Sequence, residues 1–220
     1  MEENLKDKLS KTLFHGTLLD RGLQIELCGV DFEKLNNKAD FGKGFYLTDS
    51  YALAVTTAKT RYESEKQRVG NACKPIVLKA KINCKNLSKY KIKEFYGETD
   101  DWKRFVCTNR WHDKVLKIHP EYDNNIDSRY DIVVGLVADG KLNNIRNLLY
   151  SDNYYLSEEV IKAIIPFKTY FCKNIKHKQK KIYTKAYQLS FHNSSFISSC
   201  IKYKGYDIIE TWKEDGSYEC

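Results

Sequence analysis

The sequence predicts one α+β domain spanning residues 1–220, and three observations support that prediction. With 220 residues the chain can bury a sizeable core, and its 42% hydrophobic and 30% charged residues are typical of an ordered globular protein. Only three prolines and no Ser/Gly-rich linker occur, so the sequence marks no domain boundary. Helix and strand patterns are mixed without a regular βαβ repeat, which favours an α+β fold over a doubly wound one.

Strands are expected where short apolar runs or strict apolar–polar alternation occur. The segment 76–82 alternates strictly, as a half-buried strand does, whereas 130–139 is almost continuously apolar and ends in Asp-Gly, as a central strand does. Residues 205–212 and the following Asp215-Gly216 turn predict a closing hairpin. The expected strands before that hairpin span residues 12–17, 44–48, 76–82, 130–139 and 183–192.

Helices are expected where apolar residues recur at helical spacing behind a capping residue. Asp49 or Ser50 is the N-cap of the first predicted helix, and Ser157 is the N-cap of the last. Trp102 lies on the apolar face of a further predicted helix, over residues 99–110. The expected helices span residues 50–68, 99–110, 143–150 and 157–164.

The cysteines and the N-terminus predict a protein of the reducing cytoplasm. Seven cysteines are scattered, odd in number and form no C-x-x-C pair, which argues against a disulfide framework and against a zinc site. The N-terminal segment is charged and no apolar run follows it, so no signal peptide is expected. No apolar stretch approaches the roughly 18 residues that span a bilayer. We therefore expect a cytoplasmic protein with no membrane partner and no metal.

The net charge of +8, from 37 Lys and Arg against 29 Asp and Glu, allows two interpretations. The simpler one is a solvated, lysine-rich surface in a chain of biased composition. The other is a positive field that attracts a polyanion, either a nucleic acid or a dinucleotide. The charge alone does not distinguish them.

Two short segments carry most of the functional signal: Phe-His-Gly-Thr at 14–17 and Asp-Phe-Gly-Lys-Gly-Phe-Tyr-Leu-Thr at 40–48. Taken alone, His15 is well explained as a structural histidine and Tyr46 as a core aromatic. The Gly-Lys-Gly turn alone is a loop, because the spacing and the Lys-Ser/Thr pair of a P-loop are missing. Together the segments indicate a site where an imidazole binds a hydroxyl, a phenol ring stacks and the backbone approaches a flat ligand.

These segments resemble the nicotinamide-binding core of the diphtheria-toxin/PARP-like ADP-ribosyltransferases, and the longer one is similar to a bacterial family of that superfamily, DUF3990. Three later segments resemble the same family in the same order. They are Phe-Val-Cys-Thr-Asn-Arg at 105–110, Tyr-Asp-Ile-Val-Val-Gly-Leu-Val-Ala-Asp at 130–139 and Tyr-Gln-Leu-Ser-Phe at 187–191. The resemblance covers residues 12–192 and leaves 193–220 as a C-terminal extension. It implies an ADP-ribosyltransferase-like fold with a split β-sheet core and flanking helices.

The resemblance implies a site for NAD, which serves as a substrate. In the superfamily the motif histidine binds a ribose hydroxyl and the next glycine pairs through its backbone with the nicotinamide carboxamide. Here these roles fall to His15 and Gly16. Tyr46 would stack on the nicotinamide ring, and Thr17 and Gly44 complete this part of the NAD-binding set. Because NAD cleavage passes through an oxocarbenium-like state, such an enzyme mainly positions the ring and the ribose.

Gln188 stands on the late strand, where chain-forming members of the superfamily carry a glutamate. A glutamine can bond a ribose hydroxyl, but it has no negative charge and cannot accept a proton. We therefore predict at most a single transfer of ADP-ribose, with His15, Tyr46 and Gln188 as the catalytic residues. The alternative for Gln188 is a solvent-facing position on the strand.

Thr57 occupies the place where the family usually has a second aromatic, on the helix after Tyr46. A threonine cannot stack, so either Tyr51 or Tyr62 substitutes for that aromatic or the nicotinamide ring is held on one face only. Stacking on an aromatic is worth about 1–3 kcal/mol in other nucleotide sites. One-sided stacking would therefore weaken NAD binding about tenfold or more.

Three further features have both a functional and a structural interpretation. Asn109 and Arg110 end the tryptophan-containing helix, where they either contact the phosphates or ribose of NAD or simply form a polar helix end. Asp131 and Asp139 flank the central strand, primarily as turn or cap residues. The basic run at 176–181 is either a solvated loop or a segment that steers an anionic acceptor such as RNA or DNA.

The sequence thus predicts a bacterial mono-ADP-ribosyltransferase that moves ADP-ribose from NAD to a protein or nucleic acid and releases nicotinamide. The family context adds a toxin or defence role and a regulatory partner as further options. Two alternatives remain open. One is a NAD glycohydrolase, in which water is the acceptor, and the other is a catalytically silent module that binds NAD or ADP-ribose.

Overall fold

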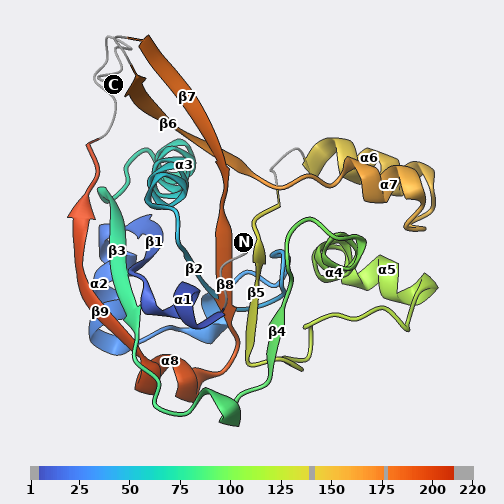
Figure 1. The fold of residues 1–220 in the computed structure, drawn as a ribbon, viewed down its shortest axis with the longest axis horizontal. Helices are drawn as coiled ribbons and strands as arrows, with labels where there is room; N and C mark the ends of the chain where they lie inside the picture. The colour runs from blue at the N-terminus through green and yellow to red at the C-terminus, as the bar shows by residue number, and fades with distance from the viewer. Residues whose placement is uncertain (1–4, 139–141, 176–177, 211–220) are drawn as a thin grey trace.

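The computed structural model describes residues 5–138, 142–175 and 178–210, which form an α+β fold around one large mixed sheet (Figure 1). The strands of this sheet are β1 (Leu13–Leu18), β2 (Phe45–Thr48), β3 (Pro75–Ile82), β4 (Ile92–Glu94), β5 (Ile132–Leu136), β8 (Tyr187–Phe191) and β9 (Ile201–Ile208). They lie in the order β4-β5-β8-β2-β1-β3-β9. Two more strands, β6 (Lys168–Ile175) and β7 (Lys178–Lys185), pair with each other and extend away from the sheet. The predicted α+β class is confirmed.

The four predicted helices are present in the structure. They are α3 (Tyr51–Val69), α4 (Asp100–Arg110), α6 (Leu142–Ser151) and α7 (Glu158–Ala163). Ser50, not Asp49, is the N-cap of α3, because its side chain accepts a hydrogen bond from the backbone of Leu53. Ser157 caps α7 in the same way. The remaining helices are α1 (Leu5–Ser10), α2 (Leu19–Cys28), α5 (His112–Ile118) and α8 (Ser194–Cys200), and none of the described helices is long and apolar enough to span a membrane.

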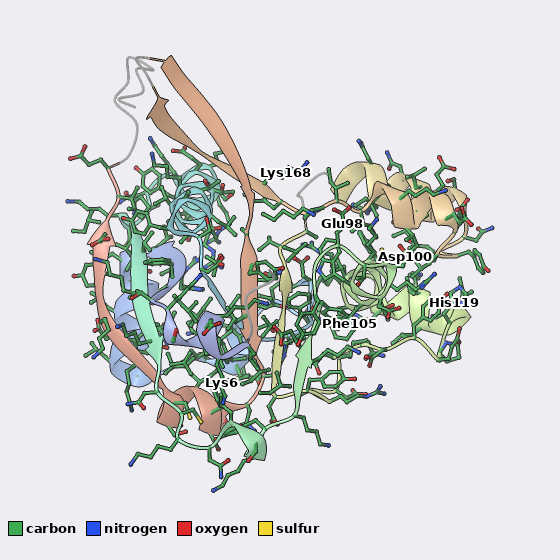
Figure 2. All side chains as sticks on the ribbon, in the orientation of Figure 1. Lys6, Glu98, Asp100, Phe105, His119 and Lys168 are labelled. Carbon is green, nitrogen blue, oxygen red and sulfur yellow. The ribbon has the colours of Figure 1, made fainter. Side chains whose placement is uncertain are left out.

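Two hydrophobic cores lie on opposite faces of β5. Helices α4, α5, α6 and α7 cover the first, which contains Val133, and α1 and α8 contribute to the second, which contains Ile132 and Val134. This division follows from the alternation of side chains along a strand. Phe105 of α4 packs in the first core with its ring 5.0 Å from that of Phe95, just after β4 (Figure 2). The continuous apolar run therefore marks a strand buried on both faces, as the sequence predicts.

The sheet is nearly divided between β1 and β2. β1 pairs with β3 along its whole length, whereas its described register with β2 consists of one pair, Phe14 opposite Thr48. The His15 side chain spans the opening next to that pair, because its ring Nδ1 lies 2.7 Å from the Tyr46 carbonyl oxygen. A split in the sheet at this point is what the resemblance implies, while the likeness to the ADP-ribosyltransferase fold itself stays a prediction.

Two strand predictions were wrong in their extent. The segment 183–192 is not one strand: β7 and β8 are separated at Ala186, and they pair with different partners. Residues 205–208 do not open a hairpin but end β9, which pairs with β3. Local alternation identifies extended chain but does not reveal where the partner strand changes. The expected Asp215-Gly216 turn lies outside the described residues.

Candidate functional site

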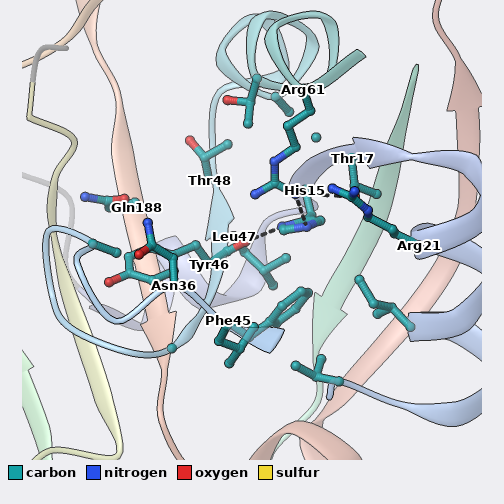
Figure 3. A pocket seen from close by; sticks show the side chains of 18 of the residues that line it. His15, Thr17, Arg21, Asn36, Phe45, Tyr46, Leu47, Thr48, Arg61 and Gln188 are labelled. Atoms are coloured by element: carbon teal, nitrogen blue, oxygen red, sulfur yellow. Dashed lines mark hydrogen bonds between the residues drawn. The ribbon is translucent and has the colours of Figure 1, made fainter. Parts of the chain in front are cut away.

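A cavity of about 880 Å³ lies where β1 and β2 separate, next to α3 (Figure 3). Ligand pockets are typically about 300–1,000 Å³, so this one has room for a sizeable organic ligand. Seven of the eight site residues predicted from the sequence line it, and the eighth, Asn109, does not. The seven are His15, Gly16, Thr17, Gly44, Tyr46, Arg110 and Gln188.

The register of the sheet explains why residues distant in sequence meet here. Along β2 and β8, Thr48 lies opposite Gln188 and Tyr46 opposite Ser190. Because alternate residues of a strand share one face, Tyr46 and Gln188 are diagonal neighbours on the same side of the sheet. The antiparallel pairing of β2 with β8 therefore joins the second motif to the late-strand residue.

His15 is held as a neutral imidazole with a defined tautomer. Its Nδ1 lies 2.7 Å from the Tyr46 carbonyl oxygen, and its Nε2 lies 3.4 Å from Nη1 of Arg61. Because a carbonyl only accepts and a guanidinium only donates, Nδ1 carries the proton and Nε2 is an acceptor. Burial above all, and then the charge of Arg61, lower the pKa of His15 to about 3, although the bond to Tyr46 acts in the opposite direction. His15 is therefore neutral throughout the physiological pH range.

Gly16 is the point where α3 packs directly on β1. A Cβ atom at this position would lie 1.9 Å from the carbonyl oxygen of Ala54, so any side chain would displace the helix. The Leu19 N–H donates a hydrogen bond to the Lys74 carbonyl, and this pair continues the register of β1 with β3. Because only every second residue of an antiparallel strand bonds to a given neighbour, the odd-numbered residues of β1 bond to β3. The backbone groups of Gly16 consequently point to the other side, toward β2 and the cavity. Gly16 thus has a packing role and also offers backbone groups to a ligand.

Tyr46 is fixed by the loop that precedes it. Its hydroxyl accepts from the N–H of Phe41 at 3.0 Å and donates to the carbonyl of Gly42 at 2.7 Å. Gly42 has φ of 85°, a conformation that favours glycine, and this closes the turn. Burial, followed by the charge of Asp40, raises the pKa of the Tyr46 phenol. The ring therefore stands at the cavity wall in one orientation and its hydroxyl stays protonated.

A buried carboxylate, Asp40, orients Gln188. Oδ2 of Asp40 accepts from Nε2 of Gln188 at 2.6 Å and from the N–H of Ala138 at 3.0 Å, while Oδ1 pairs with the guanidinium of Arg110. Because an ionised carboxylate only accepts, the amide nitrogen of Gln188 has to face Asp40, and Oε1 is left to accept from a ligand. Gln188 is 8% exposed, which excludes the solvent-facing alternative.

Arg110 and Asn109 are neighbours in sequence but differ in position. Arg110 lines the cavity beside Asp40. Asn109 is completely buried, its Nδ2 donates to the Phe105 carbonyl at 2.8 Å and its Oδ1 accepts from the Asn125 N–H at 2.9 Å. Both ends of the Asn109 amide are thus engaged within the fold, away from the cavity wall.

Helix α3 presents a threonine to the cavity where the resemblance leads us to expect an aromatic. Thr57 lines the wall, and its hydroxyl donates to the Leu53 carbonyl at 2.9 Å. The Tyr51 ring packs edge-on against Phe14, and neither Tyr51 nor Tyr62 is among the residues that line the cavity. Neither of the two tyrosines named from the sequence therefore takes the place of the expected aromatic at the cavity wall.

The sequence reasoning missed two cavity residues that bond directly to predicted site residues, Asp40 and Arg61. Asp40 opens the second motif, but its motif position gives no sign that it contacts a residue 148 positions away. Arg61 lies on α3, and a detectable signal existed for it. Leu53, Ala54, Thr57 and Arg61 all line the cavity, and their spacing is that of one helix face.

The remaining predicted features lie apart from the cavity or outside the described residues. Asp131 accepts hydrogen bonds from the backbone of Lys91 and from the side chain of Asn193, so it ties loops together at the start of β5. Asp139 falls outside the described residues. So does the start of the basic run, residues 176–177, and the rest of that run belongs to β7.

Comparison with known proteins places the chain in a family that has no assigned activity. The family model described as "Protein of unknown function (DUF3990)" matches residues 12–203, a range that contains both motifs and all strands from β1 to β8. Neither the curated proteins nor the solved structures contain a significant match. Because the family model covers most of its length, the chain belongs to the DUF3990 family.

Proposed function

We propose that the protein is a mono-ADP-ribosyltransferase that takes ADP-ribose from NAD and releases nicotinamide. One observation carries the proposal: His15, Gly16, Tyr46 and Gln188, which the motifs single out, converge on a single cavity of about 880 Å³. These residues come from three strands and span more than 170 positions of sequence. Packing alone does not require that they share a cavity, whereas a common ligand does.

Each of the four residues offers a contact that a nicotinamide riboside unit needs. The backbone of Gly16 is turned toward the cavity and can pair with the carboxamide. The fixed ring of Tyr46 covers one face of the nicotinamide. Nε2 of neutral His15 and Oε1 of Gln188 are both acceptors, and each suits a ribose hydroxyl. The site therefore offers acceptors where the ribose has donors.

In the proposed reaction, the bond between C1′ of the ribose and the nicotinamide nitrogen breaks. The electron pair leaves with nicotinamide, which becomes neutral, and the acceptor forms a new bond to C1′ and loses a proton. Asp40, the carboxylate next to Gln188, already has hydrogen-bond donors on both of its oxygens, so the proton of the acceptor passes to bulk water. The residues of the site position the substrate, which favours one transfer over chain growth.

Binding of NAD or ADP-ribose without turnover is a second candidate, and two observations favour it. Thr57 provides no second ring for the nicotinamide, and Arg110 neutralises the buried carboxylate of Asp40. A site with no free negative charge stabilises an oxocarbenium-like state less well.

Incubating the protein with NAD labelled in the adenylate moiety, in the presence of a cell lysate, tests the proposal. Label on macromolecules supports transfer, free labelled ADP-ribose points to hydrolysis, and unchanged NAD with measurable binding points to the silent module. Tyr46→Ala should abolish the activity. Tyr62→Ala is the matched control, because Tyr62 lies on α3 outside the cavity lining. Full activity in Tyr46→Ala contradicts the assignment of the site.

A further inference from the structure

Arg61 differs from the other cations of the cavity because no ion pair of the described residues includes it. The other cations that line the cavity each have a carboxylate partner. The pairs are Arg21 with Glu65 at 2.8 Å, Lys34 with Asp31 at 3.3 Å, and Arg110 with Asp40. Among the described residues, Arg61 is therefore the cation of this cavity that has no carboxylate partner.

The hydrogen bonds of Arg61 go to neutral acceptors and are long. Nη1 lies 3.3 Å from Oγ1 of Thr17 and 3.4 Å from Nε2 of His15, whereas N–H donors usually lie about 2.9–3.0 Å from their acceptors. A guanidinium has five N–H donors, and both of these contacts use the same nitrogen. The side chain extends from α3 toward His15 and Thr17 (Figure 3). Most of its donor capacity is thus left for a ligand.

The surroundings of Arg61 also disfavour its charge. The side chain is half-buried between α3 and β1. Burial above all, and then the nearby charge of Arg21, lower the pKa of Arg61 below its ordinary value. A guanidinium nevertheless stays charged in proteins, and a half-buried charge without a partner is costly. An anion bound from solution would remove this cost.

We propose that Arg61 is the anion-binding residue of the cavity and that it holds a phosphate group of the ligand. The planar fork of a guanidinium matches two oxygens of one phosphate, which a lysine or an amide cannot do. The inference rests on the proposed function, because NAD supplies the phosphates as a pyrophosphate linked to the ribose that His15 binds. Arg61 would then set the class of ligand: a nucleotide, not a free nucleoside.

The contact between His15 and Arg61 couples the ribose to the phosphate. In the structure Nε2 of His15 accepts from Arg61, and the same atom is the proposed acceptor for a ribose hydroxyl. A ribose that takes this acceptor releases Nη1 of Arg61, which then turns its donors to the phosphate. Binding of the two groups should therefore be cooperative.

Calorimetric titration with three ligands tests the proposal: NAD, ADP-ribose and nicotinamide riboside, which has the ribose but no phosphate. We expect Arg61→Gln to lower the affinity for NAD and for ADP-ribose about tenfold or more. The affinity for nicotinamide riboside should change less than about twofold. Arg61→Lys keeps the charge but lacks the planar guanidinium, so its affinities for NAD and ADP-ribose should lie between those of the wild type and those of Arg61→Gln. Arg21→Gln is the matched control, because Arg21 lines the same cavity but is already paired with Glu65.

Thermal unfolding without ligand gives a second readout. Because Arg61→Gln removes an unpaired charge, it should keep or raise the melting temperature while it lowers affinity, a combination that a purely structural arginine would not produce. The inference would be overturned if Arg61→Gln lost affinity for NAD and for nicotinamide riboside equally, or if its affinity for NAD were unchanged. If the wild type binds no NAD, the proposed function fails, and inorganic pyrophosphate tests Arg61 by itself. If pyrophosphate raises the melting temperature of the wild type but not that of Arg61→Gln, the anion site is supported. If it raises neither melting temperature, the anion site is refuted.

Discussion

Replacing Gln188 by glutamate tests the contact on which the geometry of the site depends. In the structure Nε2 of Gln188 donates to Oδ2 of Asp40 at 2.6 Å, and the two side chains are buried. In Gln188→Glu a carboxylate oxygen replaces the amide nitrogen, so a hydrogen bond becomes a contact between like charges. The change that would make the site more similar to chain-forming enzymes should therefore destabilise this fold.

The size of the effect follows from Coulomb's law. Two unit charges 4 Å apart interact by about 4 kcal/mol at the effective dielectric constant of about 20 that suits protein sites. Arg110, on the other oxygen of Asp40, offsets part of this repulsion. We therefore expect Gln188→Glu to lower the free energy of unfolding by about 2–4 kcal/mol near pH 8.

The loss should depend on pH in a defined direction. In the folded Gln188→Glu variant, repulsion by Asp40 raises the pKa of the introduced carboxyl group above its value in the unfolded chain. The folded state then binds a proton more readily, so the stability deficit shrinks as the pH falls from about 8 to about 5. Once protonated, the introduced carboxyl group also donates to Asp40 and restores the hydrogen bond.

Urea unfolding followed by tryptophan fluorescence measures this deficit at both pH values. Gln188→Ala is the control that removes the bond without adding a charge, so its deficit should not change with pH in this way. In the double variant Asp40→Asn/Gln188→Glu, the new amide can donate to the introduced carboxylate, which removes the repulsion. Part of the stability near pH 8 should return, but not all of it, because an amide nitrogen in place of Oδ2 no longer accepts from the Ala138 N–H. If Gln188→Glu were as stable as the wild type near pH 8, or equally impaired at both pH values, Gln188 would not face Asp40.

Three further predictions concern Gly16, Tyr46 and the buried histidines. Gly16→Ala places a Cβ 1.9 Å from the Ala54 carbonyl oxygen and should lower the free energy of unfolding by at least about 1–3 kcal/mol, measured in urea. Tyr46→Phe keeps the ring but leaves two loop groups unpaired, so calorimetry should show NAD affinity within about threefold while stability falls by about 1–3 kcal/mol. Burial lowers the pKa of His15 to about 3 and that of His192, whose Nδ1 lies 3.0 Å from the Lys43 carbonyl oxygen, to about 4. Stability should therefore fall as the pH drops below about 6.5, by up to about 1.4 kcal/mol per pH unit for each histidine.

Each of these three has an outcome that contradicts it. A Gly16→Ala protein with wild-type stability would show that α3 does not pack on β1 at this glycine. Loss of NAD binding in Tyr46→Phe would assign the hydroxyl, not the ring, to the ligand. For the histidines, the slope of stability between about pH 6 and pH 4 should flatten in His192→Ala, and an unchanged slope would show that His192 is not buried as a neutral ring.

The sequence predicted the elements whose signals are local. The N-cap of α7 at Ser157 and the two buried faces of β5 follow from capping and from apolar content, and both are confirmed. The helices α2 and α5 have no side-chain cap, and α1 and α8 were missed as well, although Asn193 caps α8. Tertiary packing stabilises such short helices more than their own sequence does. The break at Ala186 depends on which strand lies alongside, and a single sequence does not contain that information.

The candidate site was predictable to the extent that its residues lie in motifs. His15 and Tyr46 could be found because each stands beside glycines in a short, unusual segment. Helical spacing could have placed Arg61 on the cavity face of α3, but neither Asp40 nor Arg61 could be given a role, because their roles depend on which charged and polar groups lie near them in the folded chain. Because charge pairing is a property of the folded chain, only the structure identifies Arg61 as a cation without a carboxylate partner among the described residues.

The seam between β1 and β2 has a mechanical consequence for how variants of this protein are interpreted. Within the sheet, one described backbone pair and the side chain of His15 link the half-sheet β1-β3-β9 to the half-sheet β4-β5-β8-β2. The second hydrophobic core contains residues of both half-sheets and holds them together from one face. Removing the imidazole therefore weakens the link across the seam as well as removing a proposed ligand contact. His15→Asn, whose amide can still donate across the seam, separates the two duties: it should preserve hydrogen-exchange protection of β1 and β2 better than His15→Ala does.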